Sequence, residues 1–244
     1  MAFTAQGLSR RFGNFHALKE VSFEVARGEV LGIAGPNGAG KSTLLNVCTG
    51  VLRPSAGSIA MDGRRIDRLP LHRLSGLGLA RTFQIPQVFA SLDVETNIRV
   101  GGTFGTSGTE EDGRKRTDSI VELLNLRSLR YRLAGEADLL TRKMIMLGAA
   151  LATGPSIVFM DEPFGGLNAQ EIEDYAALVE RLRDKLGLSF VIVEHKMRAL
   201  TRLSDRLLIL NFGETLCEGT PDAVLADEQV NDIYLARRDT IAVH

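Results

Sequence analysis

Apolar and polar residues alternate near the start of the chain, and this alternation predicts strands over most of residues 1–30. The segment VSFEV (21–25) shows it most clearly. The apolar run VLGIAG (30–35) ends in glycine, and KSTLLNVCTG (41–50) then has a helical pattern that a glycine closes. We therefore expect strands at the start of the chain, followed by a buried strand and a helix.

The next part of the chain changes from turns to helices. Residues 53–70 are rich in turn residues, and the pair Asp62-Gly63 suits a hairpin. From about 86 to 152 the pattern is mostly helical, except for GGTFGTSGTEEDGRK (101–115), which we expect to be a polar, glycine-rich surface loop. The most apolar stretch is MIMLGAALATGPSIVFM (144–160), which is too short and too interrupted to span a bilayer. We therefore expect it to form a buried helix, a turn and a buried strand.

Two continuous apolar runs follow, and each ends in charged residues. They are IVFMDE (157–162) and LSFVIVEH (188–195), with the helix-like segment QEIEDYAALVERLRDKLG (170–187) between them. This order indicates a parallel sheet covered by helices, in an α/β fold. RLLILN (206–211) adds a last strand.

Composition narrows the class of protein only slightly. The chain has 244 residues, 44% hydrophobic and 24% charged, with a formal net charge of −1. This profile fits one good-sized globular domain, with or without an inserted subdomain, and offers no argument for binding nucleic acid. Cys48 and Cys217 are far apart in sequence, so we expect small core residues in a reducing compartment. The N-terminus lacks the pattern of a signal peptide, so we expect a cytoplasmic protein that reaches a membrane only through a partner.

A complete phosphate-binding motif, GPNGAGKST (35–43), lies between the predicted strand and helix. Its glycines allow the backbone to wrap around phosphate oxygens at a helix N-terminus. Lys41 would bring its charge to the β- and γ-phosphates, and the Ser42 hydroxyl would bind Mg²⁺. The alternative, a glycine-rich turn with no ligand, does not explain the whole motif in this context. We therefore predict a nucleoside triphosphate site at Gly35, Pro36, Asn37, Gly38, Ala39, Gly40, Lys41, Ser42 and Thr43.

The acidic pair that ends IVFMDE is the second part of the predicted site. Open α/β sheets place ligand-facing groups at the carboxyl ends of their strands. Asp161 would hold Mg²⁺, directly or through water, and Glu162 would polarise the attacking water. The alternative is an acidic pair that caps a helix before Pro163.

His195 ends the next apolar strand, which makes it a candidate contact for the γ-phosphate, with a purely structural histidine as the alternative. The other histidines have no such context, and we interpret them as surface or structural residues: His16, His72 and His244.

These motifs, in this order, resemble the ATP-binding subunits of ABC transporters. ARTFQ (80–84) resembles the glutamine loop, DEPFGGLN (161–168) the Walker B segment that runs into the D-loop, and VIVEHKM (191–197) the switch-histidine segment. The resemblance implies that Gln84 senses Mg²⁺ and the attacking water at the transporter interface. It also implies that Phe12 stacks on adenine, unless Phe12 is a core phenylalanine.

The resemblance covers nearly the whole chain and implies one ABC ATPase domain over residues 1–244, with ATP and Mg²⁺ as cofactors. The implied fold is a RecA-like P-loop NTPase core, formed by 1–85 and 153–244, with an N-terminal antiparallel β portion. A helical subdomain would be inserted at 86–152.

Several stretches are similar to the branched-chain amino acid importer branch of the family, and importers for urea or short amides share much of the pattern. These stretches are GLGLARTFQIPQVFASLDVETNI, DEPFGGLN, VIVEHKM and EGTPDAVLADEQVNDIYL. The resemblance implies a dimer of ATPase subunits below two membrane permease subunits, on the inner face of the cell membrane, fed by an external solute-binding protein. The transported solute cannot be read from this subunit.

The chain departs from the family pattern at two places. Asn168 stands where the D-loop usually has aspartate, and ADLLT (137–141) stands where the family's L-S-G-G-Q signature belongs. LSGLG (74–78) is no substitute, because it precedes Gln84. Asp138 would add a negative charge near the γ-phosphate and Leu140 would crowd it; two unit charges about 4 Å apart repel by roughly 4 kcal/mol at an effective dielectric near 20.

This departure leaves two hypotheses open. The chain is a hydrolysing subunit, for which we favour a heterodimer with an ordinary partner, or it is a degenerate regulatory subunit that mainly binds ATP. A soluble ABC protein of DNA repair or translation fits less well, because it needs a long coiled-coil insertion or two cassettes in one chain.

Overall fold

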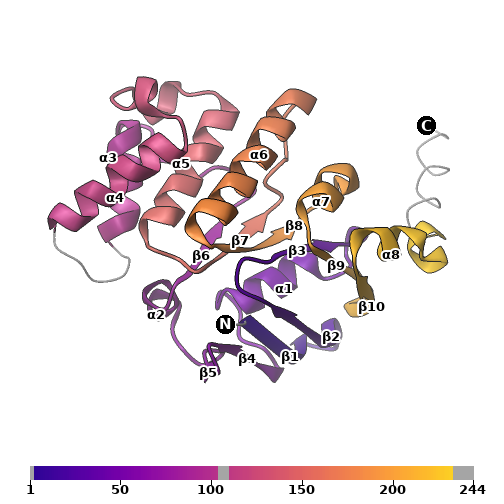
Figure 1. Cartoon of the computed structure of the whole chain (residues 1–244). Coiled ribbons are helices and arrows are strands. Elements are labelled where there is room, and N and C mark those ends of the chain that lie inside the picture. Colours follow the sequence, from indigo (N-terminus) through magenta and orange to yellow (C-terminus); the bar gives the residue numbers. More distant parts are fainter. Residues whose placement is uncertain (1–2, 104–109, 233–244) are drawn as a thin grey trace. The chain divides into compact units, whose positions relative to one another are not determined.

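The computed structural model describes residues 3–103 and 110–232. The chain divides into two compact units, Met1–Arg68 with Val191–His244, and Leu69–Phe190. Figure 1 labels the helices and strands of both units. Among the described residues, no helix is long and apolar enough to cross a membrane.

The first unit contains the N-terminal antiparallel β portion that the family resemblance implies. Four strands pair in the order β2-β1-β4-β5. The pair β4 and β5 is the predicted hairpin: Asp62 and Gly63 have φ angles of 53° and 72°, the left-handed conformations that a tight two-residue turn requires. The strands are β1 (Phe3–Phe12), β2 (Phe15–Val25), β4 (Ala56–Met61) and β5 (Arg64–Arg65).

The same unit holds the phosphate-binding strand in a second sheet. Strand β3 (Val30–Ala34) runs parallel to β9 (Arg206–Asn211), and β10 (Glu214–Gly219) pairs antiparallel with β9. Gly32 of β3 has no room for a side chain, because the side chains of Ser204, Leu207 and Leu200 fill the space beside it. The helices of this unit are α1 (Lys41–Cys48), α7 (Met197–Leu203) and α8 (Pro221–Ala226).

The second unit combines two parallel strands with several helices. Strand β6 (Leu79–Thr82) pairs parallel with β7 (Ile157–Asp161). Strand β8 (Ser189–Val193) crosses the boundary of the two units along the chain. The helices are α2 (Leu71–Gly76), α3 (Val94–Thr103), α4 (Glu110–Leu123), α5 (Leu139–Ala152) and α6 (Ala169–Leu186), with short 3₁₀ turns η1 (Arg127–Leu129) and η2 (Ala134–Glu136).

Helices α3, α4 and α5 pack side by side (Figure 1), and glycines allow the close approach. A Cβ atom on Gly101 of α3 would collide with the backbone of Ala149 on α5, and one on Gly148 would lie 2.8 Å from Leu124 Cδ1. Small residues therefore mark a packed helix pair here. These helices lie within residues 86–152, but the boundaries of the helical subdomain stay a prediction.

The predicted surface loop at 101–115 is wrong at both ends. Helix α3 continues to Thr103, and α4 already begins at Glu110, while residues 104–109 lie outside the described residues. Glycines signalled a loop in the sequence, but Gly101 is a packing residue, and α4 buries Ile120 and Val121 on its apolar side. Tertiary packing has overridden local propensity.

An ion-pair network fixes the chain between α3 and α5. The Arg130 guanidinium bonds both carboxylate oxygens of Glu95, at 2.8 and 2.9 Å, and also contacts Asp118 of α4. The hydrogen bond from Arg130 holds the pKa of Glu95 below its ordinary value. The approach to the predicted signature is therefore anchored.

The cysteines and the remaining histidines agree with their predictions only in part. Cys48 is buried in α1, and burial raises the pKa of its thiol. Cys217 on the edge strand β10 is only partly buried, so the prediction of a core cysteine is wrong there. His16 and His72 are exposed, and His244 lies outside the described residues.

Candidate nucleotide site

The phosphate-binding motif forms the predicted strand, loop and helix in the first unit. Gly35, Gly38 and Gly40 have φ angles of 148°, 82° and 102°, a region that favours glycine. A side chain at Gly35 would collide with the carbonyl of Leu210, and a Cβ at Gly40 would lie 2.6 Å from the Ala17 carbonyl oxygen. The loop therefore keeps its backbone bare and ends at the N-terminus of α1, where N–H groups favour an anion.

Lys41 is folded onto this loop. Its side chain is buried, and its ammonium donates to the carbonyl oxygens of Gly35 at 2.8 Å and Pro36 at 3.0 Å. Ser42, in the first turn of α1, is exposed. A bare loop at a helix N-terminus, with a held cation and an accessible hydroxyl, has the groups that a magnesium–triphosphate complex requires.

His195 follows β8 in the same unit, with its backbone held by Glu194. The fully buried carboxylate of Glu194 accepts hydrogen bonds from the backbone N–H groups of His195, at 2.9 Å, and Lys196, at 3.1 Å. The Glu194 N–H donates to the carbonyl of Ile33 on β3. The imidazole itself is half exposed. Glu194 was missed from the sequence, where the only signal was a charge directly after an apolar run.

Phe12 ends β1 and is 45% exposed. The Arg10 guanidinium lies 4.7 Å from its ring centroid, and the rest of the ring is exposed at the end of this inner strand. The alternative of a core phenylalanine is therefore wrong.

In the second unit, both predicted acidic residues have basic or amide partners. Asp161, the last residue of β7, forms an ion pair with Arg81 of β6 at 2.9 Å. Glu162 has a φ of 42°, unusual for a residue with a side chain, and its Oε2 accepts a 2.7 Å hydrogen bond from the Gln84 side-chain amide. The structure thus brings Gln84 and Glu162 together.

The alternative that Asp161 and Glu162 cap a helix is wrong. Helix α6, the next described helix, is capped by Asn168, whose Oδ1 accepts from the Glu171 N–H while the Glu171 carboxylate accepts from the Asn168 N–H. This reciprocal arrangement is a capping box. The departure from aspartate at this D-loop position therefore keeps a good helix cap.

A buried lysine of α5 contacts the backbone of Gln84. Lys143 of α5 is 1% exposed, and its ammonium donates to the Gln84 carbonyl at 3.2 Å. Burying a lysine is costly unless its charge has partners, so this contact ties α5 to the glutamine loop. No sequence motif pointed to Lys143.

The predicted signature segment ADLLT (137–141) lies at the N-terminus of a helix. Helix α5 begins at Leu139, with Asp138 as its N-cap, and the Asp138 Oδ1 accepts from the Thr141 N–H at 2.7 Å. The carboxylate therefore occupies one N–H group of the turn that would otherwise face an anion. Leu139 lies against Gly166 of the D-loop segment. LSGLG overlaps the end of α2 and does not start a helix.

Within the described residues, no group of three or more His, Cys, Asp or Glu side chains could hold a metal by itself. Mg²⁺ commonly takes only one or two protein ligands, together with substrate phosphates and water. The Ser42 hydroxyl in the first unit and the Asp161 carboxylate in the second unit each carry oxygen atoms of the kind that Mg²⁺ prefers.

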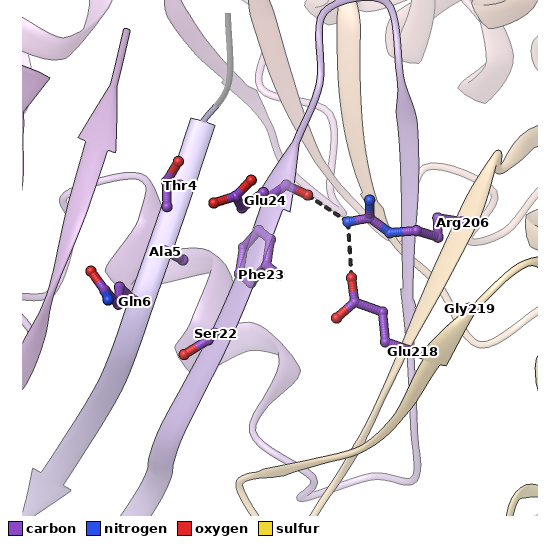
Figure 2. A pocket seen from close by; sticks show the side chains of 9 residues that line it. All are labelled: Thr4, Ala5, Gln6, Ser22, Phe23, Glu24, Arg206, Glu218 and Gly219. Atoms are coloured by element: carbon purple, nitrogen blue, oxygen red, sulfur yellow. Dashed lines mark hydrogen bonds and ion pairs between the residues drawn. The ribbon is translucent and has the colours of Figure 1, made fainter. Parts of the chain in front are cut away.

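A separate surface pocket of about 690 Å³ lies in the first unit (Figure 2) and contains none of the predicted site residues. Arg206 crosses it, donating to the Glu24 carbonyl at 2.7 Å and pairing with Glu218 at 2.9 Å and Glu29 at 3.2 Å. These contacts join β9 to β2 and β10, so we interpret Arg206 as a structural residue that holds these strands together. The lining residues are Thr4, Ala5, Gln6, Ser22, Phe23, Glu24, Arg206, Glu218 and Gly219.

Comparison with known proteins gives the class of this chain. A family model described as ABC transporter matches residues 18–165. A crystal structure of the ADP conformation of an ATP-binding cassette of an ABC transporter superposes with a TM-score of 0.87, at 31% identity, covering 96% of this chain and 99% of that chain. The chain belongs to the ABC transporter family. It is an ATP-binding cassette, an ATPase whose cofactors are ATP and Mg²⁺, with a P-loop NTPase fold.

Relatives with different transport tasks are about equally similar. The high-affinity branched-chain amino acid transport ATP-binding protein BraF of Pseudomonas aeruginosa is 31% identical, with 94% of this chain and 95% of that protein covered. The lipopolysaccharide export system ATP-binding protein LptB of Haemophilus influenzae is 30% identical, with 96% and 97% covered. The comparisons therefore define the family and leave the solute open.

Proposed function

We propose that this chain is the energy-coupling ATPase subunit of an importer for branched-chain or related amino acids. The ARTFQ form of the glutamine loop supports the importer branch, as does the similarity to the amino acid transport protein of Pseudomonas aeruginosa. Importers of urea or short amides are the nearest alternative in sequence pattern, and lipopolysaccharide export is the alternative that the other relatives raise.

In this proposal each site residue has one role. The backbone N–H groups of residues 35–43 and the Lys41 ammonium bind the triphosphate, and Phe12 stacks on the adenine. Ser42 and Asp161 would hold Mg²⁺, which would supply positive charge to neutralise the charge that develops on the phosphates. His195, with its backbone fixed by Glu194, contacts the γ-phosphate.

The observation that carries hydrolysis is the 2.7 Å bond between Gln84 and Glu162. A general base works only if its carboxylate is held at the right place, and the Gln84 amide holds one oxygen of Glu162. Glu162 then takes a proton from the attacking water. Because Gln84 lies in the segment that the family resemblance assigns to the transporter interface, movement of the permease would shift Glu162 and so couple transport to hydrolysis.

The proposed assembly is a pair of ATPase subunits on the inner face of the cell membrane, below two permease subunits that an external solute-binding protein supplies. ADLLT would act on the ATP that the partner's P-loop binds, so we favour a heterodimer. The chain's own P-loop would then be served by an ordinary signature. A regulatory subunit that binds ATP without turning it over is the second candidate, and the Asp138 cap favours it.

Measurements on the purified complex test both parts of the proposal, ATP hydrolysis and the transported solute. The chain is co-purified with its permeases, every chain is identified by mass, and single-turnover ATP hydrolysis is measured with and without the partner ATPase. Transport in proteoliposomes then compares leucine, urea and a short amide. If no hydrolysis is detected even with the partner present, the role as a hydrolysing subunit is rejected and the regulatory role remains. Uptake of urea alone would reject the amino acid assignment.

A further inference from the structure

Arg81 lies in the second unit beside the acidic residue proposed to hold Mg²⁺. In the parallel pairing of β6 with β7, Arg81 is opposite Phe159, so Asp161, two residues further on, is on the same face of the strands. The Arg81 Nη2 atom lies 2.9 Å from Asp161 Oδ2. The exposed fractions of the two side chains are 11% and 17%.

A second contact fixes the guanidinium. Its central carbon lies 5.0 Å from the centroid of the Phe83 ring, which is two residues along from Arg81. A planar guanidinium packed on an aromatic ring loses much of its freedom to turn, so its N–H groups keep one direction. Asp161 therefore receives its hydrogen bond from a donor that is itself held in place.

We propose that Arg81 is a positioning residue for Mg²⁺: it holds Asp161 by Oδ2 and thereby presents Oδ1 to the ion or to a water bound to it. This inference rests on the proposed role of Asp161. Carboxylates that bind metals are commonly oriented by hydrogen bonds from a second residue, and loss of that residue typically weakens metal binding about 10–100-fold.

Arg81 also acts in the opposite sense, because its positive charge repels a cation. Asp161 has little access to water as a substitute donor, so its orientation depends on Arg81, and we expect orientation to outweigh repulsion. Replacing Arg81 should therefore weaken the binding of a divalent cation even though a positive charge is removed.

The test measures binding in addition to turnover. Mn²⁺, detected by electron paramagnetic resonance, is titrated into the full-length protein with a non-hydrolysable ATP analogue present. Binding of the analogue without metal is measured in parallel. Arg81→Met should raise the Mn²⁺ dissociation constant about tenfold and leave the metal-free affinity for the nucleotide as in wild type. Arg132→Met, at an exposed arginine in the same unit, should match wild type.

Two further variants, Arg81→Gln and Asp161→Asn, separate the role of Arg81 from the metal role of Asp161. Arg81→Gln keeps an N–H donor without the charge and should weaken Mn²⁺ binding less than Arg81→Met; it also carries the test if the methionine variant does not fold. Mn²⁺ binding in these variants that is unchanged or tighter than wild type overturns the inference. Asp161→Asn separates the two levels: if it binds Mn²⁺ normally, the proposed metal role of Asp161 fails as well, and if it loses Mn²⁺ while the Arg81 variants do not, only the role of Arg81 fails.

Discussion

The double substitution Asp138→Ser with Leu140→Gly should raise ATPase activity several-fold, because it rebuilds an anion site at the start of α5. Asp138 places a carboxylate at the N-cap, and Leu140 occupies the second position of the helix. At about 4 Å and an effective dielectric near 20, a carboxylate repels a phosphate charge by roughly 4 kcal/mol. Asp138 is exposed, so salt and water reduce this figure, and we expect a gain of several-fold rather than a thousandfold.

The cost in stability is small. Serine and aspartate are similarly good N-caps, so the bond that Asp138 now makes to the Thr141 N–H has a replacement. Glycine at position 140 costs about 1 kcal/mol of helix stability, which corresponds to a fall in melting temperature of about 2–4 °C. The variant should therefore remain folded, and thermal unfolding checks this.

Single variants separate the charge from the crowding. Asp138→Asn keeps a capping side chain without the charge, and Leu140→Gly removes only the bulk. Steady-state turnover is measured for each, for the double variant and for wild type, alone and with the partner ATPase. If wild type alone already hydrolyses ATP rapidly and the double variant gains nothing, ADLLT is not a degenerate signature and the reasoning from charge and crowding is refuted.

Three further outcomes are expected. Lys41→Ala should abolish tight ATP binding in equilibrium titrations, and near-normal affinity would show that Lys41 does not contact the phosphates. Glu162→Gln should leave ATP binding intact and strongly slow single-turnover hydrolysis; unchanged turnover would remove Glu162 as the base. Lys143→Met should lower kcat more than it changes nucleotide affinity, because the Gln84 carbonyl loses a buried donor worth about 1–3 kcal/mol, and an unaltered kcat would contradict that support.

The sequence pattern predicted most of the backbone. The run at 206–211 coincides with β9, and Asp62-Gly63 makes the turn that its residues favour, because these signals are local. The sequence pattern failed where glycine can serve two purposes. Gly101 and its neighbours indicated a surface loop, although Gly101 lies in a helix and packs against the backbone of Ala149. A packing glycine and a turn glycine look alike until the partner helix is known.

Side-chain contacts between distant segments could not be predicted in the same way. Asp161 and Glu162 were predicted as site residues because they come at the end of a strand. Arg81 and Lys143 were not predicted as supporting residues, because the residues they contact lie 80 and 59 positions away in sequence. The sequence likewise identified Asp138 as an unfavourable charge, but only the structure shows that its carboxylate is engaged as the cap of α5.

Two residues of ARTFQ, and not its glutamine alone, contact the acidic pair at the end of β7. Parallel pairing sets Thr82 opposite Met160, so the end of β6 and the residues after it run beside the acidic end of β7. Arg81 then bonds Asp161, and Gln84 bonds Glu162. One short segment thus contacts both acids: Asp161, which is the proposed metal ligand, and Glu162, which is the proposed base. A displacement of this segment would disturb metal binding and water activation together, which is the property that a coupling element between a permease and an ATPase requires.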